Sequence, residues 1–97
     1  MKRIVIMKFK EECVEEFKTI FRKSRVHILK FDGCHHVELL IDLHDPTVMS
    51  TWSIWTDEEA LNHYRNSEFF AETWAATKVL FRDKPMAFSF NELSDHE

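Results

Sequence analysis

The sequence predicts an α+β protein in which a strand, a helix, two strands, a helix pair and a last strand follow one another. Three observations predict this order: segments of alternating apolar residues, segments with apolar residues at helical spacing, and turn-forming residues between them. The 97 residues, 44% of them apolar, are enough for one domain over residues 1–97. We expect its ordered core to span about residues 3–93.

The first predicted strand is Arg3–Phe9, whose apolar residues lie on both faces and therefore indicate that both faces are covered. A helix is predicted over Glu11–Leu29, where apolar residues recur at helical spacing on a broad face. The only glycine, Gly33, follows in the break at residues 31–33. We expect Gly33 to adopt a positive φ there.

Two further strands, His35–Leu43 and Thr47–Trp55, are predicted to form a hairpin around a turn at residues 44–46. The turn contains Pro46, which cannot donate a hydrogen bond within a sheet. Asp45 precedes it, and aspartate favours the start of a turn.

Capping residues predict two helices after the hairpin. Thr56, with Glu59 three residues later, has the pattern of a capping box and predicts a short helix to about Arg65. Ser67 is expected to cap a second helix over Glu68–Phe81.

Pro85–Leu93 completes the pattern as the last strand, before a polar tail at residues 94–97 that we expect to fray. The order βαββαβ is that of a ferredoxin-like fold, a four-stranded antiparallel sheet with helices on one face. The first, third and fourth strands carry apolar side chains on both faces, and the chain is too short for a third layer. A second copy is the expected cover, which predicts a homodimeric α+β barrel.

Composition and charge exclude several classes of function. The net charge of −4 gives no bulk attraction for phosphate backbones, so we expect no nucleic-acid partner. No apolar run approaches the roughly 20 residues of a membrane span, and the apolar stretch at the N-terminus is too short for a secretory signal. Cys13 and Cys34 lack a paired-ligand spacing, which is typical of reduced thiols in a cytoplasmic protein.

Four segments together resemble a known family: Gly33–Leu40, Asp45–Pro46, Trp55–Leu61 and Tyr64–Phe70. They are similar to the antibiotic biosynthesis monooxygenase (ABM) domain, a family of small dimeric α+β barrels that includes quinol monooxygenases and haem-degrading enzymes. The resemblance extends from Arg3 through the last strand and implies the ferredoxin-like fold and the dimer.

The resemblance also bears on single residues. Trp55 matches the tryptophan that ends the third strand and faces the cavity in many members, and Tyr64 stands where relatives often place a histidine or another ring. Two departures concern activity. The segment Ile4–Phe9 lacks the asparagine that oxygenase members often carry in the first strand, and Trp74 stands near the place of the haem-binding histidine. Haem degradation is therefore not expected, and no cofactor is implied.

Large rings are the main candidate site residues. Trp55, Tyr64 and Trp74, with Phe70 on the same predicted helix as Trp74, are expected to line a pocket for a flat aromatic ligand. The alternative for each ring is a place in the core of a small dimer.

His36 and Glu38 are two apart on a predicted strand, so they point to one face. If that face lines a cavity, the histidine is a candidate general base and the glutamate its orienting partner. The pair is also half of a two-histidine, one-carboxylate iron site, whose third ligand would be His27, His44 or His63. The third interpretation is a polar or dimer-facing strand surface.

Cys34 is expected to share a face with His36 and to diverge from its neighbour His35. No oxyanion-stabilising group is evident beside it, so a cysteine nucleophile is not favoured.

The sequence therefore predicts an ABM-type monooxygenase that oxidises a small, quinol-like aromatic without metal or flavin. The catalytic candidates are His36 and Tyr64, and the substrate-binding candidates are Trp55, Trp74, Glu38 and Phe70. The alternative is a non-catalytic dimeric α+β barrel that binds a small apolar ligand or acts as an interaction module.

Overall fold

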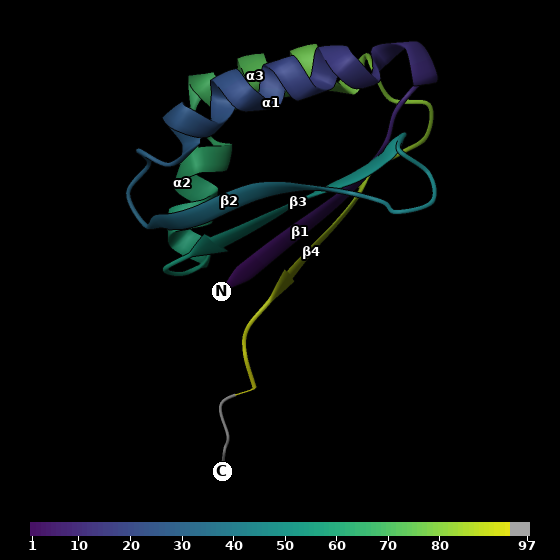
Figure 1. Cartoon of the computed structure of the whole chain (residues 1–97). Helices are drawn as coiled ribbons and strands as arrows, with labels where there is room; N and C mark the ends of the chain where they lie inside the picture. Colours follow the sequence, from purple (N-terminus) through teal and green to yellow (C-terminus); the bar gives the residue numbers. More distant parts are fainter. Residues whose placement is uncertain (94–97) are drawn as a thin grey trace.

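The computed structural model, which describes residues 1–93, has three α-helices on one face of a four-stranded sheet (Figure 1). This confirms the predicted ferredoxin-like fold. The elements are β1 (Lys2–Lys8), η1 (Glu11–Cys13, a 3-10 turn), α1 (Val14–Ile28), β2 (Cys34–Ile41), β3 (Val48–Trp55), α2 (Glu58–Arg65), α3 (Glu68–Lys78) and β4 (Met86–Phe90). The polar tail at residues 94–97 lies outside the described residues.

The sheet has the strand order β2-β3-β1-β4, and every neighbouring pair is antiparallel. Ile4 of β1 lies between Trp52 of β3 and Phe88 of β4 in this register. Since side chains alternate along each strand, one face turns toward the helices and the other turns away from them (Figure 1).

The core fills the space between the helix-facing side of the sheet and the helices. Its buried apolar residues are Met7, Phe9, Phe17, Phe21, Ile28, Val37, Met49, Trp55, Leu61 and Leu80. Phe9 is fully buried, and its ring stacks on Phe17 of α1 with 4.3 Å between the centroids. This ring stack therefore joins the residue that follows β1 to α1.

Apolar side chains also cover the opposite side of the sheet, where no helix lies (Figure 1). This open face carries Ile4, Ile6, Leu40, Trp52, Ile54, Met86, Phe88 and Phe90. Phe88 is 44% exposed and Phe90 is 50% exposed. β1 and β3 thus carry apolar side chains on both faces, and the described chain covers only one of these faces. Every residue of β4 is exposed.

Gly33 has a φ of 85°, which confirms the predicted positive value. A Cβ atom at this position would lie 2.5 Å from the Cβ of Ala60 in α2. The carbonyl of Gly33 also accepts a hydrogen bond of 2.8 Å from the backbone N–H of Thr56. Glycine therefore allows both the turn into β2 and the close approach of α2.

The predicted N-cap of α2 is wrong by one residue. Asp57, not Thr56, caps the helix, because its carboxylate accepts a 2.9 Å hydrogen bond from the N–H of Ala60. The Thr56 hydroxyl lies 2.7 Å from Nε2 of His35 instead. The predicted cap of α3 is confirmed, since the hydroxyl of Ser67 accepts a 3.0 Å bond from the N–H of Phe70.

A β-bulge at the start of β2 corrects the predicted placing of Cys34. Cys34 lies opposite Trp55 and His36 lies opposite Ile54, so one extra residue stands between them in the ladder. Cys34 therefore faces the helices with Trp55, whereas His36 lies on the open face. The two side chains do not share a face.

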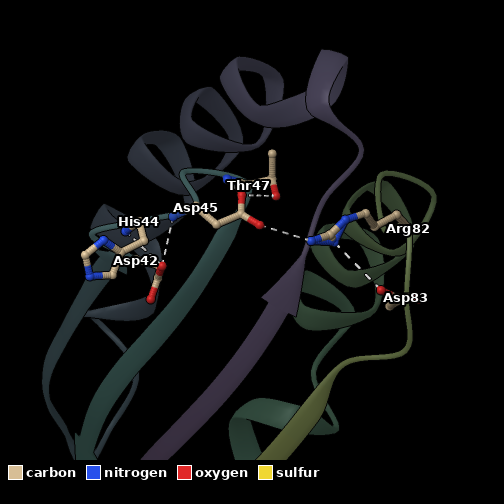
Figure 2. Close-up of polar contacts among 6 residues, drawn as sticks. All are labelled: Asp42, His44, Asp45, Thr47, Arg82 and Asp83. Carbon is tan, nitrogen blue, oxygen red and sulfur yellow. Dashed lines mark hydrogen bonds and ion pairs between the residues drawn. The ribbon is translucent and has the colours of Figure 1, made fainter.

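Side-chain hydrogen bonds shorten β2 and hold the hairpin turn (Figure 2). The carboxylate of Asp42 accepts bonds from the N–H groups of His44 and Asp45, so β2 ends at Ile41 rather than at Leu43. The carboxylate of Asp45 accepts bonds from the hydroxyl and N–H of Thr47, and these bonds lower the pKa of Asp45.

The segment between α3 and β4 adds one further pairing next to the sheet, beyond the C-terminal end of β1. α3 ends at Lys78 rather than at Phe81, because Phe81 forms an isolated bridge with Phe9 just beyond β1. Arg82 then reaches Asp45 at 3.5 Å and links this segment to the hairpin turn (Figure 2). Both loops at this end of the sheet are thereby joined.

Candidate functional site

A cavity of about 300 Å³ lies between the helix-facing side of the sheet and the helices. Its aromatic walls are Phe17, Phe21, Trp55, Tyr64, Phe70 and Trp74. Polar side chains from β1, β3 and the helices interrupt these walls: Arg3, Ser24, Thr51, Ser53, Arg65, Thr73 and Thr77. A pocket of this size with apolar walls and a few polar groups suits a small organic ligand.

Trp55 forms the inner wall at the end of β3. It is only 2% exposed, and its indole N–H donates a 2.9 Å hydrogen bond to the hydroxyl of Ser53. Its ring stacks on Tyr64 of α2, with the centroids 5.2 Å apart and the planes inclined by 24°. The hydrogen bond and the stack together fix the orientation of this wall.

Tyr64 is held among rings on several sides. Besides the stack on Trp55, the edges of Phe31 and Phe70 meet it at 5.0 and 5.1 Å between centroids. Within residues 1–93, the structure shows no hydrogen-bond partner for its hydroxyl. Burial, and secondarily the nearby Cys34, raises the pKa of Tyr64 to about 12. At neutral pH this phenol is therefore a hydrogen-bond donor and not a base.

Phe70 and Trp74 lie one turn apart on α3 and so project from the same side of the helix. Their rings are nearly parallel, inclined by 8° with 6.0 Å between centroids. Trp74 also meets Phe81 edge-on at 5.6 Å. Because Ser67 fixes the start of α3, it also fixes where these two rings enter the cavity.

Of the residues predicted for the site, Trp55, Tyr64, Phe70 and Trp74 line this one cavity. His36 and Glu38 do not, because they lie on the open face. Their expected pairing is present, with 3.3 Å between Nε2 of His36 and Oε1 of Glu38. The sheet separates this pair from the cavity, so His36 cannot accept a proton from a ligand in the cavity of its own chain.

Neither a metal site nor a reactive thiol is evident in the part of the chain that the structure describes. Within residues 1–93, no three His, Cys, Asp or Glu side chains gather in a metal-binding arrangement. Burial raises the pKa of the Cys34 thiol, whose S–H donates a weak 3.9 Å bond to the carbonyl of His36. The neutral thiol is therefore the favoured form, and it is a poor nucleophile.

Sequence reasoning missed two cationic residues of the cavity, Arg3 and Arg65. A signal for Arg3 was present, because it alternates with Val5 and Met7 and therefore shares their inward face. No comparable signal exists for Arg65, which ends α2 and is exposed at its surface.

The fold places the chain in a class of small α+β proteins with one antiparallel sheet covered by helices on one face. The chain belongs to the antibiotic biosynthesis monooxygenase family, whose model matches residues 2–76. No protein of curated function matches the sequence significantly. Of the helices within residues 1–93, none has the length and apolar character that crossing a bilayer requires.

Several solved structures share the fold. A protein described as antibiotic biosynthesis monooxygenase superposes with a TM-score of 0.88 at 18% identity, covering 95% of this chain and 97% of its own. A conserved protein from Methanosarcina mazei gives 0.85 at 23% identity, covering 90% and 87%. A protein from Pseudomonas aeruginosa gives 0.84 at 19% identity, covering 96% and 93%. At these identities the likeness shows the fold alone.

The raised pKa of Tyr64 can be measured directly, because this is the only tyrosine of the chain. We expect the ultraviolet absorbance of tyrosinate to appear with a midpoint near pH 12 in the folded protein and near 10 in denaturant. The folded protein holds the proton more tightly. The protonated Tyr64 therefore adds to the free energy of unfolding in full below about pH 10, and this addition is lost as the pH rises toward 12. Tyr64→Phe, which contains no tyrosine, is the control. A midpoint near 10 in the folded protein would contradict the buried position of Tyr64.

Proposed function

We propose that this chain is an ABM-type monooxygenase that oxidises a small, quinol-like aromatic in the cavity, with electrons from the substrate rather than from a metal or flavin. The observation that carries the proposal is an aromatic cavity of about 300 Å³ with the protonated Tyr64 among its lining residues. A cavity of roughly 150 Å³ can hold benzene, so one of this size suits one or two rings.

The proposed reaction needs only the quinol and dioxygen. The ionised quinol gives one electron to O₂, and the two radicals combine to form a C–O bond to a ring carbon. The resulting peroxide anion takes a proton from water, and the hydroperoxide then loses water together with the hydrogen of the same ring carbon, which leaves a carbonyl. One oxygen atom thus enters the product and the other leaves as water, and the substrate supplies all four electrons that O₂ accepts.

In this reaction Tyr64 donates a hydrogen bond to the substrate oxyanion, which favours the form that reacts with O₂. Trp55 and Phe70 hold the ring and exclude water from the reacting anion. The guanidinium of Arg3 adds positive charge that lowers the pKa of a bound phenol. The phenolic proton leaves to water, because neither histidine nor carboxylate side chains are among the described lining residues.

The lack of such a base among residues 1–93 favours a second candidate, a non-catalytic barrel that binds a small apolar ligand. In that case the cavity holds an aromatic without consuming oxygen. The two candidates make the same prediction for binding and opposite predictions for oxygen uptake.

Oxygen uptake with a panel of hydroquinones distinguishes these candidates. We expect consumption above the autoxidation rate in buffer for at least one member of the panel. Tyr64→Phe should lower kcat on the order of 100-fold, because it removes the donor to the oxyanion. Glu72→Gln, an exposed change on α3 outside the cavity, should leave kcat unchanged. Binding without uptake for every hydroquinone would reject the oxygenase in favour of the binding protein.

We also propose that a second copy of the chain covers the open face, giving the homodimer expected from the sequence. ABM proteins are typically dimeric. Support also comes from the contiguous apolar side chains of β1, β3 and β4, among them Ile4, Trp52 and Phe88. A face of this kind on a soluble protein marks an interaction site.

Light scattering tests the dimer. We expect a mass near twice 11.7 kDa for the native chain. Phe88→Asp, which places a charge on the open face, should shift the mass toward the monomer. Val26→Asp is the matched control, because Val26 is 56% exposed on α1 and lies away from that face. A native chain that remains a monomer at micromolar concentration would overturn this assembly.

A further inference from the structure

We infer that the cavity takes a small aromatic that carries a carboxylate, and that Arg3 and Arg65 bind this carboxylate. This names the substrate class of the proposed oxygenase. It rests on that proposal only in requiring that the cavity bind an aromatic ring, and not on any reaction with oxygen.

The first support is where the two arginines lie. Arg3 is on β1, opposite Ser53 of β3 and Ser89 of β4 in the register, and its Nη1 donates a 3.0 Å hydrogen bond to the hydroxyl of Ser89. Ser53 in turn accepts the indole N–H of Trp55. Arg3 and Trp55 therefore line the same cavity, and the hydrogen bond holds the guanidinium of Arg3 on the β4 side of it.

Arg65 follows Tyr64 directly at the end of α2 and lines the same cavity. It is exposed, whereas Arg3 is half-buried. The two guanidinium groups are close enough to repel each other. Burial lowers the pKa of Arg3, and the positive charge of Arg65 lowers it further.

The second support is that these two charges lack acidic partners within residues 1–93. Lys2, Lys18 and Arg82 each form an ion pair with a carboxylate, but Arg3 and Arg65 do not. The described lining of the cavity contains no Asp or Glu either. Two cations that remain uncompensated beside a partly enclosed apolar space attract an anionic group of the ligand.

The planar guanidinium group favours a carboxylate as this anion, because its fork of donors matches the two carboxylate oxygens. A ring bound in this cavity shares its lining with both arginines, so its carboxylate would have Arg3 and Arg65 as the available cationic partners. The volume of about 300 Å³ leaves room for one substituted ring and its acidic group. A neutral quinol would leave both cations uncompensated.

A matched set of three ligands tests this inference: 2,5-dihydroxybenzoate, its neutral amide and unsubstituted hydroquinone. Binding to the full chain is measured by calorimetry without oxygen, so that turnover plays no part. We expect the carboxylate to bind about 10-fold more tightly than the amide. Its affinity should fall as salt is added, whereas that of the amide should not.

Variants assign this preference to the two residues. Arg65→Gln and Arg3→Gln should each weaken carboxylate binding about 10-fold and leave amide binding within about twofold. Arg22→Gln, an exposed change of the same kind on α1 outside the cavity, is the control. Since Arg3→Gln loses the bond to Ser89 and could impair folding, the exposed Arg65→Gln keeps the test decisive.

The outcomes separate the two proposals. If the amide and the carboxylate bind equally and Arg65→Gln changes neither, the carboxylate site is refuted while the oxygenase proposal stands. If none of the three ligands binds, the aromatic cavity itself is refuted and both proposals fall.

Discussion

The stack of Tyr64 on Trp55 is the interaction on which the cavity depends, because it joins α2 to the end of β3. Only Thr56 and Asp57 separate β3 from the helix, and the cap on Asp57 starts α2 at once. Because Gly33 has no side chain, Ala60 of α2 can approach it more closely than a Cβ atom at position 33 would allow. These local constraints place the phenol over the indole, and both rings line the cavity together with Phe70 and Trp74 of α3.

The sheet gives its two faces different roles because the helices cover only one of them. The covered face contributes Arg3, Ser53 and Trp55 to the cavity, while the open face presents Ile4, Trp52 and their neighbours. We propose that the first face holds an aromatic acid and the second a partner chain. Since alternate residues of the same strands serve both faces, a one-residue shift of register would exchange them.

Local patterns predicted the element order, the positive φ of Gly33 and the cap on Ser67, because each depends on residues close in the sequence. The bulge after Cys34 was not predictable, since it follows from pairing with β3, and it reversed the expected relation of Cys34 to His36. The alternation of side chains along a strand correctly predicted that His36 and Glu38 share a face. It does not indicate which face of the sheet the helices cover. Arg65 enters the cavity only through the tertiary position of α2.

A crystal structure grown without oxygen in the presence of 2,5-dihydroxybenzoate would show whether the aromatic cavity is a ligand site. We expect a ring bounded by Trp55, Phe70 and Trp74, with a ligand oxygen about 3 Å from the hydroxyl of Tyr64. A cavity filled only by protein side chains, or a ligand bound solely on the open face, would contradict it.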